Sequence, residues 1–142
     1  MKQKITLVQS ILLKQHEQIC QKHLIELLNQ IKTDGYISDP IIVDQNTMII
    51  LDGHHRFNAI KLLGLTAVPV YFVDYRSEKI QVAAWSKENG EVTKQDVIQA
   101  GLSGKLLMPK TSRHTIPKRP TGLRILLSQL IIRSYPSQTY LE

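Results

Sequence analysis

The stretch LDGHHRFNAIKLLG, residues 51–64, joins the end of an apolar run to the start of a helix-like pattern, with Gly53 at the junction. Glycine allows close backbone approach to a ligand or a positive φ. The residues after it would form a first helical turn, whose amide N–H groups lack internal partners and carry partial positive charge. Such a strand–glycine–helix turn is a typical phosphate-binding geometry.

The polar side chains of this turn suit the same ligand. Arg56 can form a forked, charge-assisted pair of hydrogen bonds, and His54 and His55 add further donors. Asp52 would repel a phosphate directly, so we expect it to bind Mg²⁺ or to orient a histidine. One alternative is that Asp52 merely caps the helix while its neighbours face solvent. A zinc site is less favoured, because adjacent histidines on a helix point roughly 100° apart.

The rest of the chain has the pattern of an α/β (α+β) domain, predicted to be a single compact domain over residues 1–142. Leucines and isoleucines at helical spacing precede Gly35, which suits a C-terminal cap. Thr93 and Asp96 have capping-box spacing, and Gly101 is expected to end their helix. We expect strands within 4–14, 39–44, 47–52, 67–75 and 79–85, helices within 21–35, 54–63 and 93–101, a loop over 105–122, and a strand or helix over 123–132.

Composition restricts the class of protein. A chain of 142 residues with 42% hydrophobic side chains can bury a core. No window approaches the ~18 apolar residues of a membrane span, and the first ten residues do not resemble a secretory signal. Cys20 is the single cysteine, which excludes an internal disulfide and fits a reducing compartment. These features predict a cytoplasmic protein without a membrane partner.

The net charge of +6 is unevenly distributed. Residues 1–96 contain 11 basic and 11 acidic side chains, whereas residues 97–142 contain seven basic side chains and one acidic side chain, Glu142. An anion is the natural partner of this last third, either nucleic acid or a small phosphate or carboxylate. A merely solvated basic surface is the alternative.

Four other features bear on function. PKTSRH, residues 109–114, gathers two cations, two hydroxyls and an imidazole, which suits either an anion site or a basic solvent loop. Glu17 lies just before a helix, where a side chain can reach a cleft. Trp85 follows an apolar run, and this local composition favours packing of its ring in the core. We expect His16 and His23 to lie at the surface, since neither has a convergent partner in the sequence.

These segments together resemble the ParB N-terminal/sulfiredoxin-like superfamily, and within it the free L-serine kinases. The resemblance spans about residues 8–128. It is carried by LLKQHEQICQKHLIELLNQIKTDGYISDPIIVD (12–44), with its His16-Glu17 pair, and by DGHHRFNAIKLLG (52–64), VPVYFVDY (68–75), AAW (83–85), TKQDVIQAG (93–101) and GKLLMPKTSRHTIP (104–117). It implies a mixed sheet flanked by helices. It also implies phosphoryl transfer from ADP or ATP to free L-serine, which gives O-phospho-L-serine for cysteine biosynthesis.

The resemblance also implies roles for individual residues. Glu17 would be the general base on the serine hydroxyl, and Trp85 would lie near the bound serine. Asp52 would bind Mg²⁺ and act in catalysis beside the nucleotide phosphates. The phosphates would be held by Gly53, His54, His55 and Arg56, and the amino acid and the transferred phosphate by Lys110, Thr111, Ser112, Arg113 and His114.

The sequence departs from the family pattern in three ways, and it also fits two other functions. Ser112 and Met108 stand where the family commonly has threonine and proline, and the chain is shorter than typical serine kinases. The basic last third also suits a ParB-like DNA-binding, partition or transcription-regulator module, although no helix-turn-helix pattern follows the domain. A catalytically inactive nucleotide-binding sensor is a third possibility. The sequence does not determine the oligomeric state.

Overall fold

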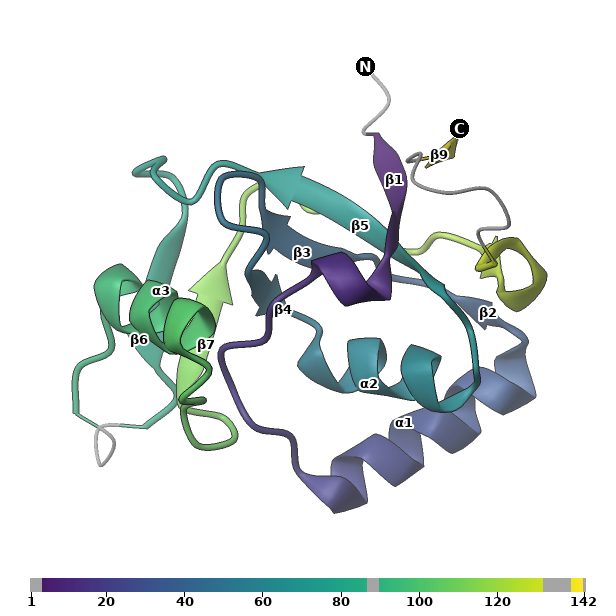
Figure 1. Cartoon of the computed structure of the whole chain (residues 1–142), viewed down its shortest axis with the longest axis horizontal. Helices are drawn as coiled ribbons and strands as arrows, with labels where there is room; N and C mark the ends of the chain where they lie inside the picture. The colour runs from purple at the N-terminus through teal and green to yellow at the C-terminus, as the bar shows by residue number, and fades with distance from the viewer. Residues whose placement is uncertain (1–3, 87–89, 132–138, 142) are drawn as a thin grey trace.

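A mixed sheet forms the centre of the protein, which a computed structural model describes over residues 4–86, 90–131 and 139–141. The strand order is β4-β3-β5-β1-β9 (Figure 1). β3 and β5 run parallel, and the other neighbours run antiparallel. This architecture agrees with the predicted α+β fold. The strands are β1 (Ile5–Gln9), β3 (Ile41–Asp44), β4 (Ile50–Asp52), β5 (Ala67–Val73) and β9 (Thr139–Leu141).

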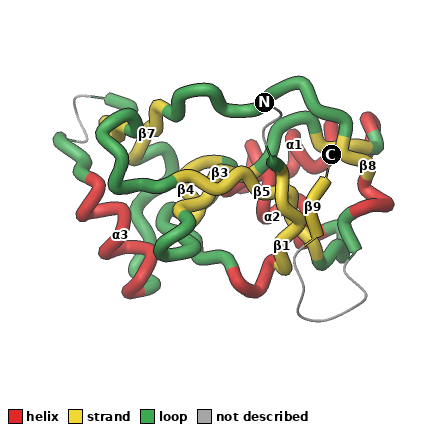
Figure 2. Tube along the Cα trace, turned by 90° about the horizontal axis from the view of Figure 1, so that it is seen from above, coloured by secondary structure: helices red, strands yellow, loops and turns green. Residues whose placement is uncertain are grey.

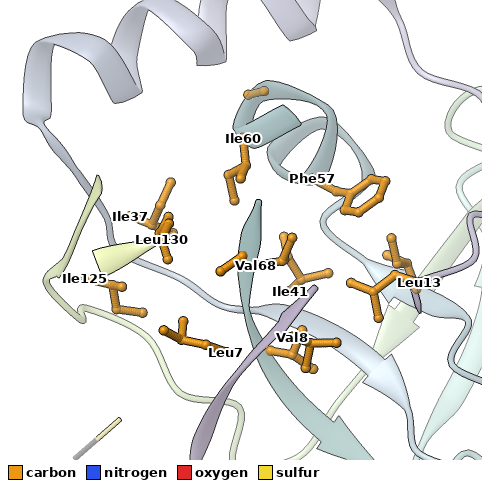
Figure 3. Packing of buried hydrophobic residues seen from close by; sticks show 14 of the residues in the cluster. Leu7, Val8, Leu13, Ile37, Ile41, Phe57, Ile60, Val68, Ile125 and Leu130 are labelled. Atoms are coloured by element: carbon orange, nitrogen blue, oxygen red, sulfur yellow. The ribbon is translucent and has the colours of Figure 1, made fainter. Parts of the chain in front are cut away.

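Two helices, α1 (Gln21–Asp34) and α2 (His54–Leu62), pack together on one face of this sheet (Figure 1). Phe57 and Ile60 of α2 point toward the strands and meet Ile41 and Val68 in the main core (Figure 3). Burial of these apolar side chains removes them from water and fixes α2 against β3. The start of α2 is therefore held at the end of β4.

A second layer of structure lies at the end of the molecule opposite β8 (Ile125–Leu126), as Figure 2 shows. It consists of α3 (Lys94–Ser103) and a two-stranded sheet of β6 (Gln81–Ala84) and β7 (Ser112–Thr115). Its own apolar cluster includes Ile49, Tyr75 and Val97. This cluster positions β7 close to β4.

Several element boundaries differ from the sequence-based expectations. The helix expected to end at Gly101 continues to Ser103 and ends at Gly104, which adopts φ 79°. Gly101 is instead a packing position, since an added Cβ would lie 2.6 Å from Ile49 Cδ1. The predicted capping box of Thr93 and Asp96 is confirmed.

The expected loop over 105–122 contains β7, because polar residues 112–115 pair with β6. The expected first strand stops at Gln9 and continues as a short 3₁₀ helix, η1 (Ser10–Leu12). The ambiguous segment 123–132 forms β8, paired with β2 (Tyr36–Ile37), and a 3₁₀ helix, η3 (Leu127–Gln129). Ile132, Arg133 and Glu142 lie outside the described residues. Within the described part of the chain, no helix has the length and apolar character needed to cross a bilayer.

Candidate functional site

A cavity of about 560 Å³ lies where the β4–α2 turn meets the turn before β7. The two segments that the sequence singled out, 52–56 and 109–114, both contribute to its wall. The segment before α1, the first turns of α1, the residue after β6 and Arg119 complete it. Of the predicted site residues, Glu17, Asp52, Gly53, His54, His55, Arg56, Trp85, Lys110, Ser112, Arg113 and His114 border the cavity.

Thr111 is the predicted site residue that the structure does not bring to this cavity. It borders a separate hollow beside α3. Its hydroxyl donates a hydrogen bond to the carbonyl of Met108 at 2.5 Å, within the turn itself. Lys110 adopts a left-handed backbone in this turn, at φ 58°. Its side chain borders the site cavity, whereas that of Thr111 borders the other hollow. Thr111 therefore stabilises the turn from the side that faces away from the site cavity.

The β4–α2 turn has the geometry that its glycine predicts. Gly53 is the N-cap of α2 at φ 102°, and no side chain caps the helix. The alternative in which Asp52 caps α2 is therefore wrong. An added Cβ on Gly53 would lie 2.9 Å from Ile41 Cδ1 and 3.0 Å from an Arg56 guanidinium nitrogen. The open N-terminus of α2, with its partial positive charge, forms one wall of the cavity.

Two arginines lie at this wall, and sequence reasoning missed one of them. Arg56 donates to the carbonyl of Pro40 at 3.0 Å, and burial lowers the pKa of its guanidinium, which nevertheless stays charged at neutral pH. Arg119 forms an ion pair with Asp52 and borders the cavity. Its position in the basic, proline-rich segment was the available signal, but the 67-residue separation from Asp52 gave no spacing to detect.

His16 is completely buried, so the expectation that it lies at the surface is wrong. Its Nδ1 lies 2.6 Å from the carbonyl oxygen of Ile50, and its Nε2 lies 2.9 Å from Ser112 Oγ. Its backbone N–H donates to His54 Nε2 at 3.1 Å. Burial lowers the pKa of His16 to about 4, so its ring is neutral at pH 7.

The neighbouring histidines are held neutral by the same cause. Burial, reinforced by nearby imidazoles, lowers the pKa of His54 and lowers that of His114 to about 3. His114 Nε2 lies 2.8 Å from the hydroxyl of Tyr75. His55 Nε2 accepts the backbone N–H of Cys20 at 2.9 Å, and its ring meets that of the exposed His23 edge-on. The cavity thus contains neutral imidazoles between fixed cations.

These buried rings predict a pH-dependent stability. The folded state binds fewer protons than the unfolded chain at His16 and His114, so the unfolding free energy falls as pH drops below about 6.5. We expect a loss of about 1–3 kcal/mol between pH 7 and pH 5. Urea unfolding at both pH values measures it. An unfolding free energy that is the same at both would contradict the neutral state of these rings.

Glu17 is half-buried in the segment before α1, which is pinned to Leu107 by main-chain hydrogen bonds on either side. Its Oε1 accepts the backbone N–H of Ser112 at 2.8 Å and lies 3.1 Å from the Ser112 hydroxyl. Burial raises the pKa of Glu17 above its ordinary value, and this effect outweighs the backbone N–H groups that lower it. A carboxylate with a raised pKa is a stronger base.

Trp85 does not pack in the core, contrary to the expectation from its composition. The residue is 55% exposed just after β6, and the Arg113 guanidinium lies over the ring, 5.1 Å from its centre. An indole paired with a cation at a cavity edge offers a flat apolar surface beside a positive charge. That combination suits a small zwitterion or a charged planar group.

The side chains that could bind a metal ion distinguish between Zn²⁺ and Mg²⁺. Within the described ranges, no group of three histidine, cysteine or carboxylate side chains could hold a metal ion. The zinc alternative is therefore wrong for this part of the chain. Two carboxylates, Asp52 and Glu17, border the cavity. Mg²⁺ at nucleotide sites commonly uses one or two carboxylates together with phosphate oxygens and water. The Asp52 carboxylate, at the β4–α2 turn, fits Mg²⁺ that arrives with a nucleotide, whereas Glu17 is already bonded to Ser112.

The fold and the cavity together define an α+β domain with a polar, largely cationic cavity at the start of α2. Comparison with known proteins identifies its family: the chain belongs to the ParB N-terminal domain family, whose sequence profile matches residues 3–89. A "ParB-like protein" of Sulfolobus acidocaldarius is 40% identical over 75 residues, which are 53% of this chain and 37% of that protein. An "ATP-dependent L-serine kinase" of Staphylothermus marinus is 35% identical over 74 residues, 49% of this chain and 29% of that protein.

A solved structure extends the likeness to nearly the whole chain. "Free serine kinase in complex with AMP" matches 92% of this chain and 95% of its own, with a TM-score of 0.83 and 18% sequence identity. At this identity the match shows a shared fold. The curated relatives are about three times as long as the segment they share with this chain.

Proposed function

We propose that this protein transfers a phosphoryl group from ATP or ADP to the hydroxyl of free L-serine, giving O-phospho-L-serine. One observation carries the proposal: the Glu17 carboxylate borders the same cavity as the N-terminus of α2 and the cationic turn before β7. A cavity of about 560 Å³ suits small ligands. The serine kinases among the similar proteins support the choice of substrate. O-phosphoserine is an activated precursor that suits cysteine biosynthesis.

The nucleotide phosphates would bind at the β4–α2 turn. Free backbone N–H groups at the start of α2 and the Arg56 guanidinium supply positive potential there. Asp52 would hold Mg²⁺ through the oxygen that Arg119 does not use. The bound ion would neutralise charge that develops on the phosphoryl oxygens. Arg119 would keep the Asp52 carboxylate oriented.

The amino acid would bind on the opposite wall. Lys110 and Arg113 can pair with its carboxylate and with the transferred phosphate, while Ser112 and His114 supply neutral hydrogen-bonding groups. Trp85 would cover the bound molecule from the cavity edge. This arrangement would aim the serine hydroxyl at the phosphate while Glu17 takes up its proton, because a hydroxyl is a weak nucleophile at neutral pH.

Phosphorus NMR tests the proposal directly. The protein is incubated with Mg²⁺, L-serine and either ATP or ADP, and parallel samples contain L-threonine, L-homoserine or no amino acid. We expect one new phosphomonoester signal that requires serine, and the donor that supports it identifies the nucleotide. Donor hydrolysis without a phosphomonoester, or no reaction with either donor, would contradict the proposal.

A ParB-like DNA-binding module is the second candidate, favoured by the 40% identical relative and by the basic last third. Nucleic-acid binding of this kind weakens steeply with salt. Duplex DNA binding that falls along such a slope, in a protein that forms no phosphoserine, would favour this function. Tight nucleotide binding without turnover or DNA binding would instead indicate an inactive sensor.

A further inference from the structure

A buried relay of hydrogen-bonding groups connects Glu17 to the main chain of the central sheet. It runs from Glu17 Oε1 to Ser112 Oγ at 3.1 Å, from there to His16 Nε2 at 2.9 Å, and from His16 Nδ1 to the Ile50 carbonyl at 2.6 Å. Ser112 and His16 are both buried. Their protons are therefore constrained by these partners.

The Ile50 carbonyl fixes the tautomer of His16. A carbonyl oxygen only accepts, so Nδ1 carries the proton in this contact. The buried ring is neutral, so Nε2 carries none and is an acceptor. The group within its reach is the hydroxyl of Ser112. His16 is thus arranged to accept the one proton that this hydroxyl can give.

Ser112 consequently has two acceptors for a single proton. The Glu17 carboxylate competes for it with the neutral imidazole. A proton on Ser112 that points to Glu17 stabilises the carboxylate, whereas one that points to His16 leaves the carboxylate with less support. When Glu17 itself becomes protonated, Ser112 is free to donate fully to His16. The imidazole therefore favours the protonated form of Glu17.

We propose that His16 is a positioning residue that strengthens Glu17 as a base by drawing the Ser112 hydroxyl proton away from it. This role rests on the proposed kinase function, in which Glu17 receives the proton of the serine hydroxyl. The proton leaves the serine oxygen and binds the Glu17 carboxylate as the oxygen bonds to phosphorus. In the same step the Ser112 hydroxyl donates to His16, while Glu17 keeps the backbone N–H of Ser112.

Other charged or titratable side chains border the same cavity as Glu17. They come from every element around the cavity, namely Lys110 in the turn, Arg113 and His114 on β7, His54, His55 and Arg56 on α2, His23 on α1, Asp52 at the end of β4, and Arg119, which is paired with Asp52. Variants that change His16 or Ser112 leave all of these side chains in place. A change in the Glu17 titration can then be assigned to the relay.

The test uses two substitutions of His16. They differ in whether the new side chain can accept a hydrogen bond from Ser112. In His16→Asn the amide nitrogen can occupy the place of Nδ1 and donate to Ile50, but nothing accepts from Ser112. In His16→Gln the amide oxygen can reach the place of Nε2 and accept from Ser112. We expect His16→Asn to lower the Glu17 pKa by about one unit, and His16→Gln to leave it closer to the wild-type value.

The pKa of Glu17 is measured by carbon-13 NMR of its carboxyl group in protein without nucleotide or serine. The same His16→Asn change is then made in a Ser112→Ala background, where no hydroxyl proton remains to be redirected, and there it should have no effect on Glu17. An unchanged pKa in His16→Asn, or an equal shift with Ser112 absent, would overturn the proposal. The acid limb of the pH–rate profile should move in the same direction as the pKa.

A second measurement needs no variant and covers the case in which a His16 substitution unfolds the protein. Nitrogen-15 NMR of the wild-type imidazole reports its tautomer, and we expect the proton on Nδ1 at neutral pH. A proton on Nε2 would overturn the inference. If the Glu17 pKa shifts as described but no phosphoserine forms, the relay is supported and the kinase proposal is wrong. If phosphoserine forms but the pKa does not shift, the kinase proposal is supported and the relay is wrong.

Discussion

Replacing Glu17 with glutamine is expected to lower the turnover of free serine by about 10²–10⁴-fold. The amide cannot take the proton of the serine hydroxyl, whereas its carbonyl oxygen can still accept the Ser112 N–H that Glu17 accepts at 2.8 Å. The cavity should therefore keep its shape and its affinity for nucleotide. Steady-state kinetics with serine gives the turnover, and calorimetry gives the nucleotide affinity.

The stability of this variant separates lost chemistry from lost folding. The folded protein holds a proton on Glu17 more tightly than the unfolded chain does, since burial raises its pKa. The stability that this group contributes is therefore greatest at acidic pH and declines as pH rises through the raised pKa. Glutamine stays neutral throughout, so Glu17→Gln should be at least as stable as wild type at pH 7 in urea unfolding.

Glu26→Gln provides the matched control. It makes the same chemical change at an exposed position on α1. We expect full turnover in this control. A Glu17→Gln protein that folds normally and still turns over serine at the wild-type rate would show that another group, or water, receives the proton.

The features predicted correctly from sequence are those that depend on neighbouring residues. Gly35 ends α1 in a left-handed conformation, with its N–H bonded to the Ile31 carbonyl at 2.8 Å. Gly53 begins α2 with a positive φ, and Thr93 forms its capping box. Each signal lies within a few residues of the structure it specifies, so a local pattern is sufficient.

The features that escaped prediction depend on residues far apart in the chain. His16 is buried because Ile50 and Ser112 surround its ring, at separations of 34 and 96 residues. A single histidine in a short irregular segment has no periodicity that would indicate burial. Trp85 shows the opposite error: β6 belongs to a small two-stranded sheet, so an apolar run there still leaves its ring at the surface.

The sequence predicted the candidate site as two separate segments. The fold brings these two segments together in space. β7 is short and polar and lies between prolines, so its sequence indicates a loop. It becomes a strand because β6 pairs with it, and this pairing orients Ser112 and His114 toward the cavity. The charged and polar residues of the two segments were therefore sufficient to predict the site. The pairing of strands that are distant in the sequence determined which of these residues face each other.

Gly53→Ala is expected to weaken nucleotide binding by at least about tenfold, which corresponds to about 1.4 kcal/mol. The residue adopts φ 102°, which L-residues with a Cβ rarely tolerate. The new methyl group would also lie 2.9 Å from Ile41 Cδ1, in the core, and 3.0 Å from the Arg56 guanidinium. Since Arg56 is tied to the Pro40 carbonyl, relief requires the start of α2 to shift. Calorimetry with ADP measures the change.

Gly35→Ala is the control that separates backbone strain from damage to the site. Gly35 has a similar positive φ of 78°, but an added Cβ meets nothing within 4 Å, and the residue does not border the cavity. Gly35→Ala should lose about 1 kcal/mol of unfolding free energy from backbone strain, and Gly53→Ala should lose more because of its additional close contacts. Only Gly53→Ala should lose nucleotide affinity. Equal losses of affinity would indicate a general effect of destabilisation, and wild-type affinity in Gly53→Ala would remove the β4–α2 turn from the phosphate site.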